Sequence, residues 1–353
     1  MNRIGKILLF AILILFPLIT ASGEYRSARG EKKWKFPEDH GAHPDFRTEW
    51  WYFTGHLKGE NSVYGFELTF FRFANNNRFA KESEWSARQY YLTHFTVTDE
   101  AKGKFYKYET LNRGTLGIAG SATDSLNVWS ALYSARLDKN GNFIISASNP
   151  EINLRLTLIQ TTDVVLNGND GLSRKGPNNG EASYYYSVPR LEGKGSLEIN
   201  KKNITIKKAS VWMDREFFTI QESRNQGWDW FAIQLDNGSN LMLYRLRDNN
   251  GNKTRFSSGT YINKIGQKKI LNPSDFRLIP LSYWKSRSTG IRYPVEWRIV
   301  VSDLNLDLKA KAVLNNQELV LEKLIKINYW EGRATVNGSD KGRAYIELVG
   351  YSK

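Results

Sequence analysis

The 353-residue chain contains no cysteine and only nine prolines. The absence of cysteine excludes disulfide bonds, thiolate catalysis and a lipid anchor attached at a signal-peptide cleavage site. The chain also lacks a G-x-S-x-G nucleophile elbow, a phosphate-binding loop and a dinucleotide-binding fingerprint. We therefore expect a hydrophobic core to hold the protein together, and acids, histidines and aromatic side chains to carry any chemistry without a cofactor.

Long apolar runs are missing except near the start of the chain. Two basic residues precede an apolar run over residues 7–19, and small residues follow it. This run is shorter than a typical membrane-spanning helix. The pattern predicts a signal peptide over residues 1–23 and a polar leader over residues 24–33, with an uncleaved anchor as the alternative. We expect an exported protein, periplasmic or extracellular.

The formal net charge is +14, and the lysines and arginines are spread along the chain. A basic protein can bind nucleic acid or an anionic membrane surface. Nucleic-acid motifs such as an aromatic RNP pair or a zinc finger are absent from the sequence. We therefore expect no nucleic-acid partner, and contact with a membrane surface remains an open alternative.

Short alternating runs separated by turn residues dominate the mature chain, and helical periodicity is weak. This pattern predicts an all-β protein. Four segments recur in the same order, which indicates an internal duplication. The paired segments are 50–57 and 228–235, 152–156 and 304–308, 184–186 and 329–330, and 195–199 and 343–348. We predict two domains, over residues 34–205 and 206–353, each a sandwich or an up-and-down barrel. A barrel of about eight strands can hold one small ligand, and its aromatic-lined mouth is the expected site for a hydrophobic molecule.

Residues 40–57 contain three of the four histidines, and the fourth is His94. Their spacing does not match a zinc motif, so we predict no metal site. This segment is either a surface loop that leads into a strand or the lining of a pocket.

A second notable segment surrounds Asp214. If it forms a strand, Trp212, Asp214 and Glu216 share one face because strand side chains alternate. Acids beside a tryptophan can have a raised pKa and donate a proton near neutral pH. The alternative is that both acids are exposed and pair with Arg215 or Lys207.

Glu49 precedes a pair of tryptophans and would share a strand face with Trp51. Arg47 is the alternative, as an ion-pair partner for Glu49. His56 and His94 each lie within a strand pattern, where a histidine is either a hydrogen-bonded structural residue or a functional group.

Long motifs across the chain resemble the AttH-like family of secreted proteins, often labelled predicted hydrolases and related to bacterial carotenoid 1,2-hydratases. They are HGAHPDFRTEWWYFTGHL, VWMDREFF, GWDWFAIQLDNGSNLMLYRLR, YPVEWRI and YWEGRATVNGS. The resemblance covers residues 36–351 and implies two lipocalin-like β-barrel domains in tandem. It also implies a hydrophobic small-molecule ligand, an isoprenoid or a lipid.

The hydratase relatives imply addition of water to an isoprenoid double bond without a cofactor. This chemistry needs an acid, aromatic faces beside the carbocation and a positioned water. The candidates are Asp214 as acid with Glu216 or Glu49 behind it, Trp50, Trp51 and Trp212 for the cation, and His43, His56 or His94 for the water. A carrier without chemistry and a hydrolase with an acid-activated water are the alternatives.

One position departs from the family motif, which usually reads Trp-Met-Asp-His-Glu. Arg215 occupies the histidine position. If that histidine is catalytic in relatives, this chain is altered or inactive. If position 215 faces solvent, opposite Asp214, the change is harmless, and strand alternation favours this second outcome.

Overall fold

The computed structural model describes residues 25–75, 88–220, 227–321 and 327–352. The expected signal peptide lies outside the described residues. The described chain is almost entirely β-structure, apart from two single-turn 3-10 helices, η3 (Glu38–His40) and η4 (Ser302–Leu304). Within these residues no helix is long and apolar enough to span a membrane.

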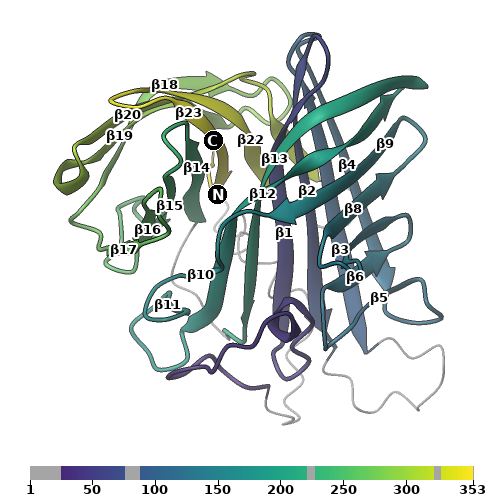
Figure 1. Ribbon diagram of the computed structural model, residues 1–353. Coiled ribbons are helices and arrows are strands. Elements are labelled where there is room, and N and C mark those ends of the chain that lie inside the picture. Colours follow the sequence, from purple (N-terminus) through teal and green to yellow (C-terminus); the bar gives the residue numbers. More distant parts are fainter. Residues whose placement is uncertain (1–24, 76–87, 221–226, 322–326, 353) are drawn as a thin grey trace, which may run out of the picture.

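The strands form two antiparallel sheets (Figure 1). The first sheet runs from β4 (Lys104–Arg113) through β3 (Gln89–Asp99), β2 (Val63–Ala74), β1 (Thr48–Lys58), β13 (Lys202–Phe218), β12 (Ala182–Ile199), β9 (Ile152–Gln160), β8 (Phe143–Ser148), β7 (Tyr133–Leu137) and β6 (Asn127–Ser130) to β5 (Ala119–Ser121). Two short strands, β10 (Val165–Leu166) and β11 (Leu172–Arg174), also pair with β12.

The second sheet repeats this arrangement with fewer strands. It runs from β17 (Lys268–Leu271) through β16 (Ser258–Ile262), β15 (Asn240–Arg247), β14 (Gly227–Leu235), β23 (Gly342–Val349), β22 (Ile327–Gly338), β20 (Leu306–Ala312) and β19 (Arg292–Val301) to β18 (Arg277–Lys285), and β21 (Glu318–Leu321) pairs with β22. Just as β1 lies between β2 and β13, β14 lies between β15 and β23. The fold is therefore all-β, with two tandem barrel-like domains of matching strand order.

Two details differ from the sequence-based expectation. Residues 195–199 belong to the far end of β12, so the strand that corresponds to β23 is β13. The expected boundary between residues 205 and 206 falls inside β13, which belongs to the first sheet along its whole length. The change from one sheet to the other comes after Phe218 and before Gly227. Repeated motifs locate equivalent strands, but they do not show where a long strand begins.

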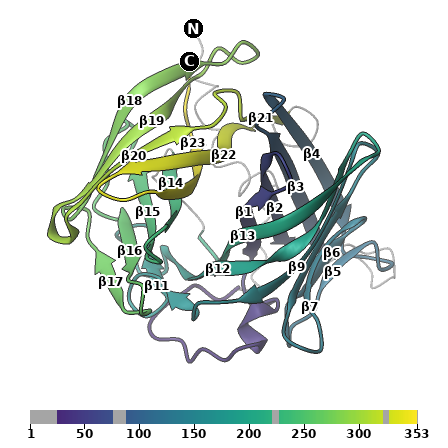
Figure 2. The same ribbon diagram turned by 45° about the horizontal axis from the view of Figure 1, so that its top comes forward.

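Each sheet curls around a core of its own (Figure 2). Among the described residues, large buried side chains such as Trp51, Phe66 and Phe70 fill the inside of the first sheet. A third apolar cluster joins the outer faces of the two sheets, with Tyr52 and Trp212 from the first and Trp230 from the second. The aromatic residues that we expected at a barrel mouth are therefore divided between a filled core and the contact between the domains.

Strand alternation determines which side chains enter which cluster. In β1, Trp51 points into the first core, and its neighbour Tyr52 points toward the second sheet. Both faces of β1 and β13 are thus covered, which explains why these strands are buried along most of their length.

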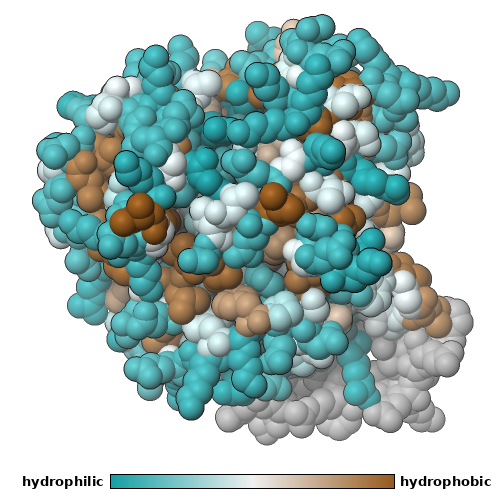
Figure 3. All heavy atoms as spheres, in the orientation of Figure 1, coloured by the Kyte–Doolittle hydropathy of each residue, from teal (hydrophilic) through white to brown (hydrophobic). Residues whose placement is uncertain are grey.

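On the face shown in Figure 3 the surface is mostly hydrophilic, and apolar residues are visible over the middle of the molecule.

Candidate functional site: acids between the two sheets

Trp212, Asp214 and Glu216 share one face of β13, as predicted, and this face points toward the second sheet. Asp214 and Glu216 are only 4% and 5% exposed. The alternative interpretation, in which both acids lie in solvent, is therefore wrong. The contact between the two domains covers them.

Three groups donate hydrogen bonds to the carboxyl of Asp214. They are the hydroxyl of Tyr185, Ser187 Oγ at 2.5 Å and Trp212 Nε1 at 2.6 Å. Trp230 Nε1, from the second sheet, donates to the Tyr185 hydroxyl at 3.0 Å. Burial raises the pKa of Asp214 to about 7, against the three hydrogen bonds, which lower it. Asp214 can therefore hold or release a proton near neutral pH.

Glu216 has a different environment two residues further along β13. It forms an ion pair with Lys175 Nζ at 2.9 Å and accepts a hydrogen bond from the Ser183 hydroxyl. Lys207, one of the two expected partners, instead lies 3.2 Å from the exposed Glu60. Because an ion-paired carboxylate does not readily donate a proton, Asp214 is the better acid of the two.

Three further acids in this region, two buried and one half-buried, were not among the candidates from the sequence. They are Glu67 in β2, Glu331 in β22 and Glu347 in β23, and Glu331 accepts a hydrogen bond from the Tyr52 hydroxyl. Burial raises the pKa of Glu67 and Glu347 to about 8, and burial with the charge of Glu67 raises that of Glu331 well above its ordinary value. Each is the only acid in its strand, which is a signal that the sequence did contain.

Four aromatic residues form a stripe on the outer face of the first sheet that leads to Glu216. They are Trp50, Phe71, Phe73 and Phe218. The ring centroids of Trp50 lie 6.1 Å from Phe71 and 5.1 Å from Phe218, and Phe71 stacks on Phe73 at 6.4 Å. Trp50 is directly opposite both Phe71 and Glu216 in the sheet. Trp50, Phe71 and Phe73 are only half-buried, so an apolar molecule can contact them next to Glu216.

Glu49 lies on the opposite face of the first sheet, away from Asp214. Its carboxylate binds the guanidinium groups of Arg72 and Arg215, and all three side chains are fully buried. The two arginines hold the pKa of Glu49 far below its ordinary value, although burial alone would raise it. The expected partner, Arg47, is therefore replaced by Arg72 and Arg215. A carboxylate held in this way cannot serve as a proton donor.

Arg215 points away from Asp214, as alternation predicted, but it does not face solvent. It is fully buried, its guanidinium lies 3.9 Å from the ring centroid of Trp51, and Nη2 donates to Gly41 O at 2.5 Å. Trp51 is itself fully buried in the first core and donates from Nε1 to His40 O at 2.9 Å. Trp51 is therefore a core residue on the side of the sheet opposite the acids.

The three candidate histidines lie in separate places. His43 stacks on Phe217 at 3.6 Å near one end of the first sheet. His56 Nδ1 accepts a hydrogen bond from Arg333 at 3.1 Å, and burial lowers its pKa. His94 lies 2.7 Å from the Tyr329 hydroxyl, and burial lowers its pKa to about 3. In the part of the chain that the structure describes, no three His, Cys, Asp or Glu side chains are arranged to hold a metal ion.

The protein is therefore a tandem of two barrel-like β-domains, joined by a buried face of acids and aromatic rings. The chain belongs to the AttH-like family, whose model matches residues 27–351. A crystal structure of an AttH protein from Nitrosomonas europaea is 30% identical, with a TM-score of 0.82, over 91% of this chain and 98% of that one. Kievitone hydratase from Nectria haematococca shares the fold at 17% identity, with a TM-score of 0.69, over 90% and 92% of the two chains. A comparison with curated proteins gives no match.

Proposed function

We propose that this protein is exported and that it binds a hydrophobic small molecule, an isoprenoid or a lipid, beside the aromatic stripe. We also propose that it adds water to this molecule by cofactor-free acid catalysis. The observation that carries the proposal is Asp214. It is a buried carboxyl with a pKa of about 7, between aromatic residues of two domains. Its partner across the sheet, Tyr52, is two residues from Trp50 of the stripe. The hydratase among the structural neighbours supports the reaction class by its fold alone.

In this mechanism the protonated carboxyl of Asp214 transfers its proton to one carbon of a double bond, and the other carbon becomes a cation. The faces of Trp50 and Trp212 stabilise the positive charge. A water molecule then forms a C–O bond with the cationic carbon, and its surplus proton returns to Asp214. The sum is one water added per double bond, with the acid regenerated. Tyr185 and Ser187 hold the carboxyl in position throughout the cycle.

The positions of the histidines bear on the role that we expected for them. Along the sheet, His94 is three strands from Asp214, which corresponds to about 14 Å. His43 is near Glu49 on the opposite side, and His56 is engaged with Arg333. We therefore place the water beside Tyr185 and Ser187 rather than beside a histidine.

A carrier without chemistry is the second candidate function, and one observation favours it. Asp214 already accepts three hydrogen bonds, which is the usual arrangement of a structural carboxyl. In a carrier, the same aromatic stripe would bind the ligand, and the acids would serve only to join the two domains.

The first experiment identifies the ligand. The mature protein is purified without detergent and extracted with organic solvent, and the released molecules are identified by mass spectrometry. The molecule found, or otherwise a panel of isoprenoids, is then incubated with the protein in water enriched in oxygen-18. Product that contains the heavy oxygen supports hydration, and stoichiometric ligand without such product supports the carrier.

We predict that Asp214→Asn lowers turnover by about 10²–10⁴-fold, the usual contribution of a general acid, while ligand binding persists. Wild-type activity should fall as the pH rises above about 7, because Asp214 must be protonated to act. Asp303→Asn, a change of an exposed acid in η4, is the matched control. Unchanged turnover in Asp214→Asn would disprove the assignment of the acid.

A further inference from the structure

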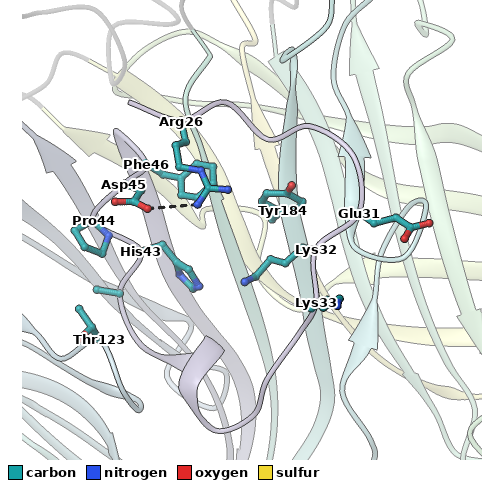
Figure 4. Close-up of a pocket in the computed structure, with 11 residues that line it drawn as sticks. Arg26, Glu31, Lys32, Lys33, His43, Pro44, Asp45, Phe46, Thr123 and Tyr184 are labelled. Atoms are coloured by element: carbon teal, nitrogen blue, oxygen red, sulfur yellow. Dashed lines mark hydrogen bonds and ion pairs between the residues drawn. The ribbon is translucent and has the colours of Figure 1, made fainter. Parts of the chain in front are cut away.

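A pocket of about 570 Å³ lies at one end of the first sheet, on the side opposite Asp214. The leader passes over it and contributes Arg26, Lys32 and Lys33, and the segment before β1 contributes His43 and Phe46 (Figure 4). Its volume is within the range of small-molecule sites. None of the residues proposed to act in hydration lines this pocket.

The charged groups in and behind the pocket sum to one positive charge. The pocket walls carry Arg26, Lys32 and Lys33 against the carboxylates of Glu31 and Asp45. Directly behind it, the carboxylates of Glu49 and Asp39 contact three cationic side chains, those of Arg72, Arg215 and Lys32. Each cation contacts a carboxylate, and the groups are fully or largely buried, so this cluster carries one surplus positive charge in a poorly solvated place. A buried charge of this kind is costly unless a counter-ion offsets it.

His43 connects the buried charges to the pocket. Its Nε2 lies 3.0 Å from Asp39, and its Nδ1 lies 3.5 Å from Glu49 and 3.4 Å from Arg215. One edge of the imidazole remains partly exposed and forms part of the pocket wall. An anion in the pocket would therefore lie one side chain away from the surplus charge.

The remaining walls indicate the chemical class of the ligand. Figure 4 shows the guanidinium of Arg26 and the ammonium of Lys32 directed toward the space in front of His43. Arg26 has one weak ion pair, with Asp45 at 3.4 Å, and the side chains of Arg26 and Asp45 are largely exposed. Phe46 and Tyr184 form an apolar wall beside these cations.

We propose that this pocket binds a small organic anion, a carboxylate or a phosphate monoester. Arg26 and Lys32 bind the anionic group, and Phe46 and Tyr184 contact the apolar part. The site is separate from the proposed hydration site, so either proposal can fail without the other.

The test is calorimetric titration of the mature protein with hexanoate and with inorganic phosphate, at constant ionic strength set by chloride. We expect saturable binding of at least one probe at a single site. Arg26→Gln should weaken it by about five-fold or more, as expected for a lost charge-assisted hydrogen bond. Lys35→Gln is the matched control, because Lys35 is an exposed lysine just after the leader that does not line the pocket.

Lys32→Met should weaken binding further, but it also breaks the contact with Asp39, so its folding is checked by circular dichroism. The exposed Arg26 keeps the test valid if Lys32→Met does not fold. Bromide soaked into crystals should give an anomalous peak between Arg26 and Lys32. If neither probe saturates, or if Lys35→Gln weakens binding as much as Arg26→Gln, the proposal is wrong.

Vesicles distinguish a lipid headgroup from a free anion. Sedimentation with phosphatidylglycerol vesicles but not phosphatidylcholine vesicles, abolished by phosphate and by Arg26→Gln, would identify a headgroup as the ligand. Phosphate or hexanoate binding without sedimentation would identify a free small anion. Absence of both would overturn the proposal.

Discussion

Glu49 holds together the inside of the first sheet at one end. It binds Arg72 and Arg215, and the three side chains are fully buried. Arg215 also lies against the ring of Trp51 and donates to the carbonyl of Gly41. A buried ion pair adds little net stability, but removal of one partner leaves an uncompensated charge in the interior. We therefore expect a loss of folding stability when the Glu49 carboxylate is neutralised.

We predict that Glu49→Gln lowers the free energy of unfolding by about 3–5 kcal/mol. The physical reason is that two guanidinium groups lose the carboxylate that offsets their burial. The measurement is urea-induced unfolding followed by circular dichroism. The control is Glu60→Gln, which removes an exposed charge paired only with an exposed lysine. A loss no larger than that of the control would contradict this interpretation.

The same residue makes stability depend on acid pH. The pKa of Glu49 is depressed in the folded protein, so its contribution is present above the ordinary glutamate value and is lost as the pH falls below it. Asp39, whose pKa is lowered to about 2 by hydrogen bonds with His43 and Lys32 against its burial, adds to this trend. The first domain is thus expected to be sensitive to acid.

At the scale of single elements, β12 and β13 connect most of the molecule. They are the longest strands in the described chain, and β13 carries both Asp214 and Arg215 on opposite faces. The pairing of β12 with β13 shifts register between Gly193 and Gly195. At Gly195 a Cβ atom would lie 2.0 Å from the carbonyl oxygen of Arg155 in β9. Glycine is therefore required there by the close approach of the neighbouring backbone.

We predict that Gly195→Ala lowers the free energy of unfolding by about 1–3 kcal/mol, because the strands must separate to accommodate the new methyl group. Ser196→Ala, at the exposed neighbouring position in β12, should have little effect. Thermal unfolding of the two variants checks the difference. Equal melting temperatures would show that β9 and β12 move apart without cost.

At the scale of the whole molecule, polar groups join the two domains. The Tyr52 hydroxyl donates to Glu331, Trp230 donates to Tyr185, and Arg190 donates to Asn240 at 2.8 Å. Acids with raised pKa values lie within this contact, so at neutral pH it holds protonated carboxyls rather than opposed charges. The protonation of these acids therefore depends on the packing of one domain against the other.

The raised pKa values of these acids predict that the protein loses stability as the pH rises toward 8. Glu67 and Glu347 have folded pKa values of about 8 against an ordinary value of 4.5, so the folded protein binds more protons across that range. Stability then falls as the pH rises, by about 1.4 kcal/mol per pH unit for each carboxyl that stays protonated.

Buried histidines act in the opposite sense at lower pH. Burial lowers the pKa of His40 to about 4 and that of His94 to about 3. Their contribution is lost as the pH falls below 6.5, which offsets the carboxyls in that range. The net loss of stability should therefore be steepest between about pH 6.5 and pH 8.

Urea midpoints measured across this pH range test the prediction. Glu67→Gln, which keeps the shape of a protonated glutamate, should make the decline shallower, and Glu60→Gln should leave it unchanged. If wild type and Glu67→Gln decline with the same slope, the Glu67 carboxyl is not protonated in the folded protein.

Much of this fold follows from patterns a few residues long. Alternation predicted strands, and it placed Trp212, Asp214 and Glu216 on one face because the pleat itself directs successive side chains to opposite sides. Repeated segments predicted two similar domains, and the matching strand order of the two sheets confirms them. These features depend on local backbone geometry, so a single segment of the sequence is enough to predict them.

Other features depended on segments far apart in the chain. Alternation showed that Arg215 and Asp214 face opposite ways, but it could not show what covers each face. Tyr52 meets Glu331 across 279 positions of sequence, and Glu49 meets Arg215 across 166. Local patterns in the sequence were enough to predict the strands, the duplication and the shared face of the acids. The packed structure was needed to show that this face lies between two domains and that position 215 lies in a core, because burial depends on which distant surfaces pack together.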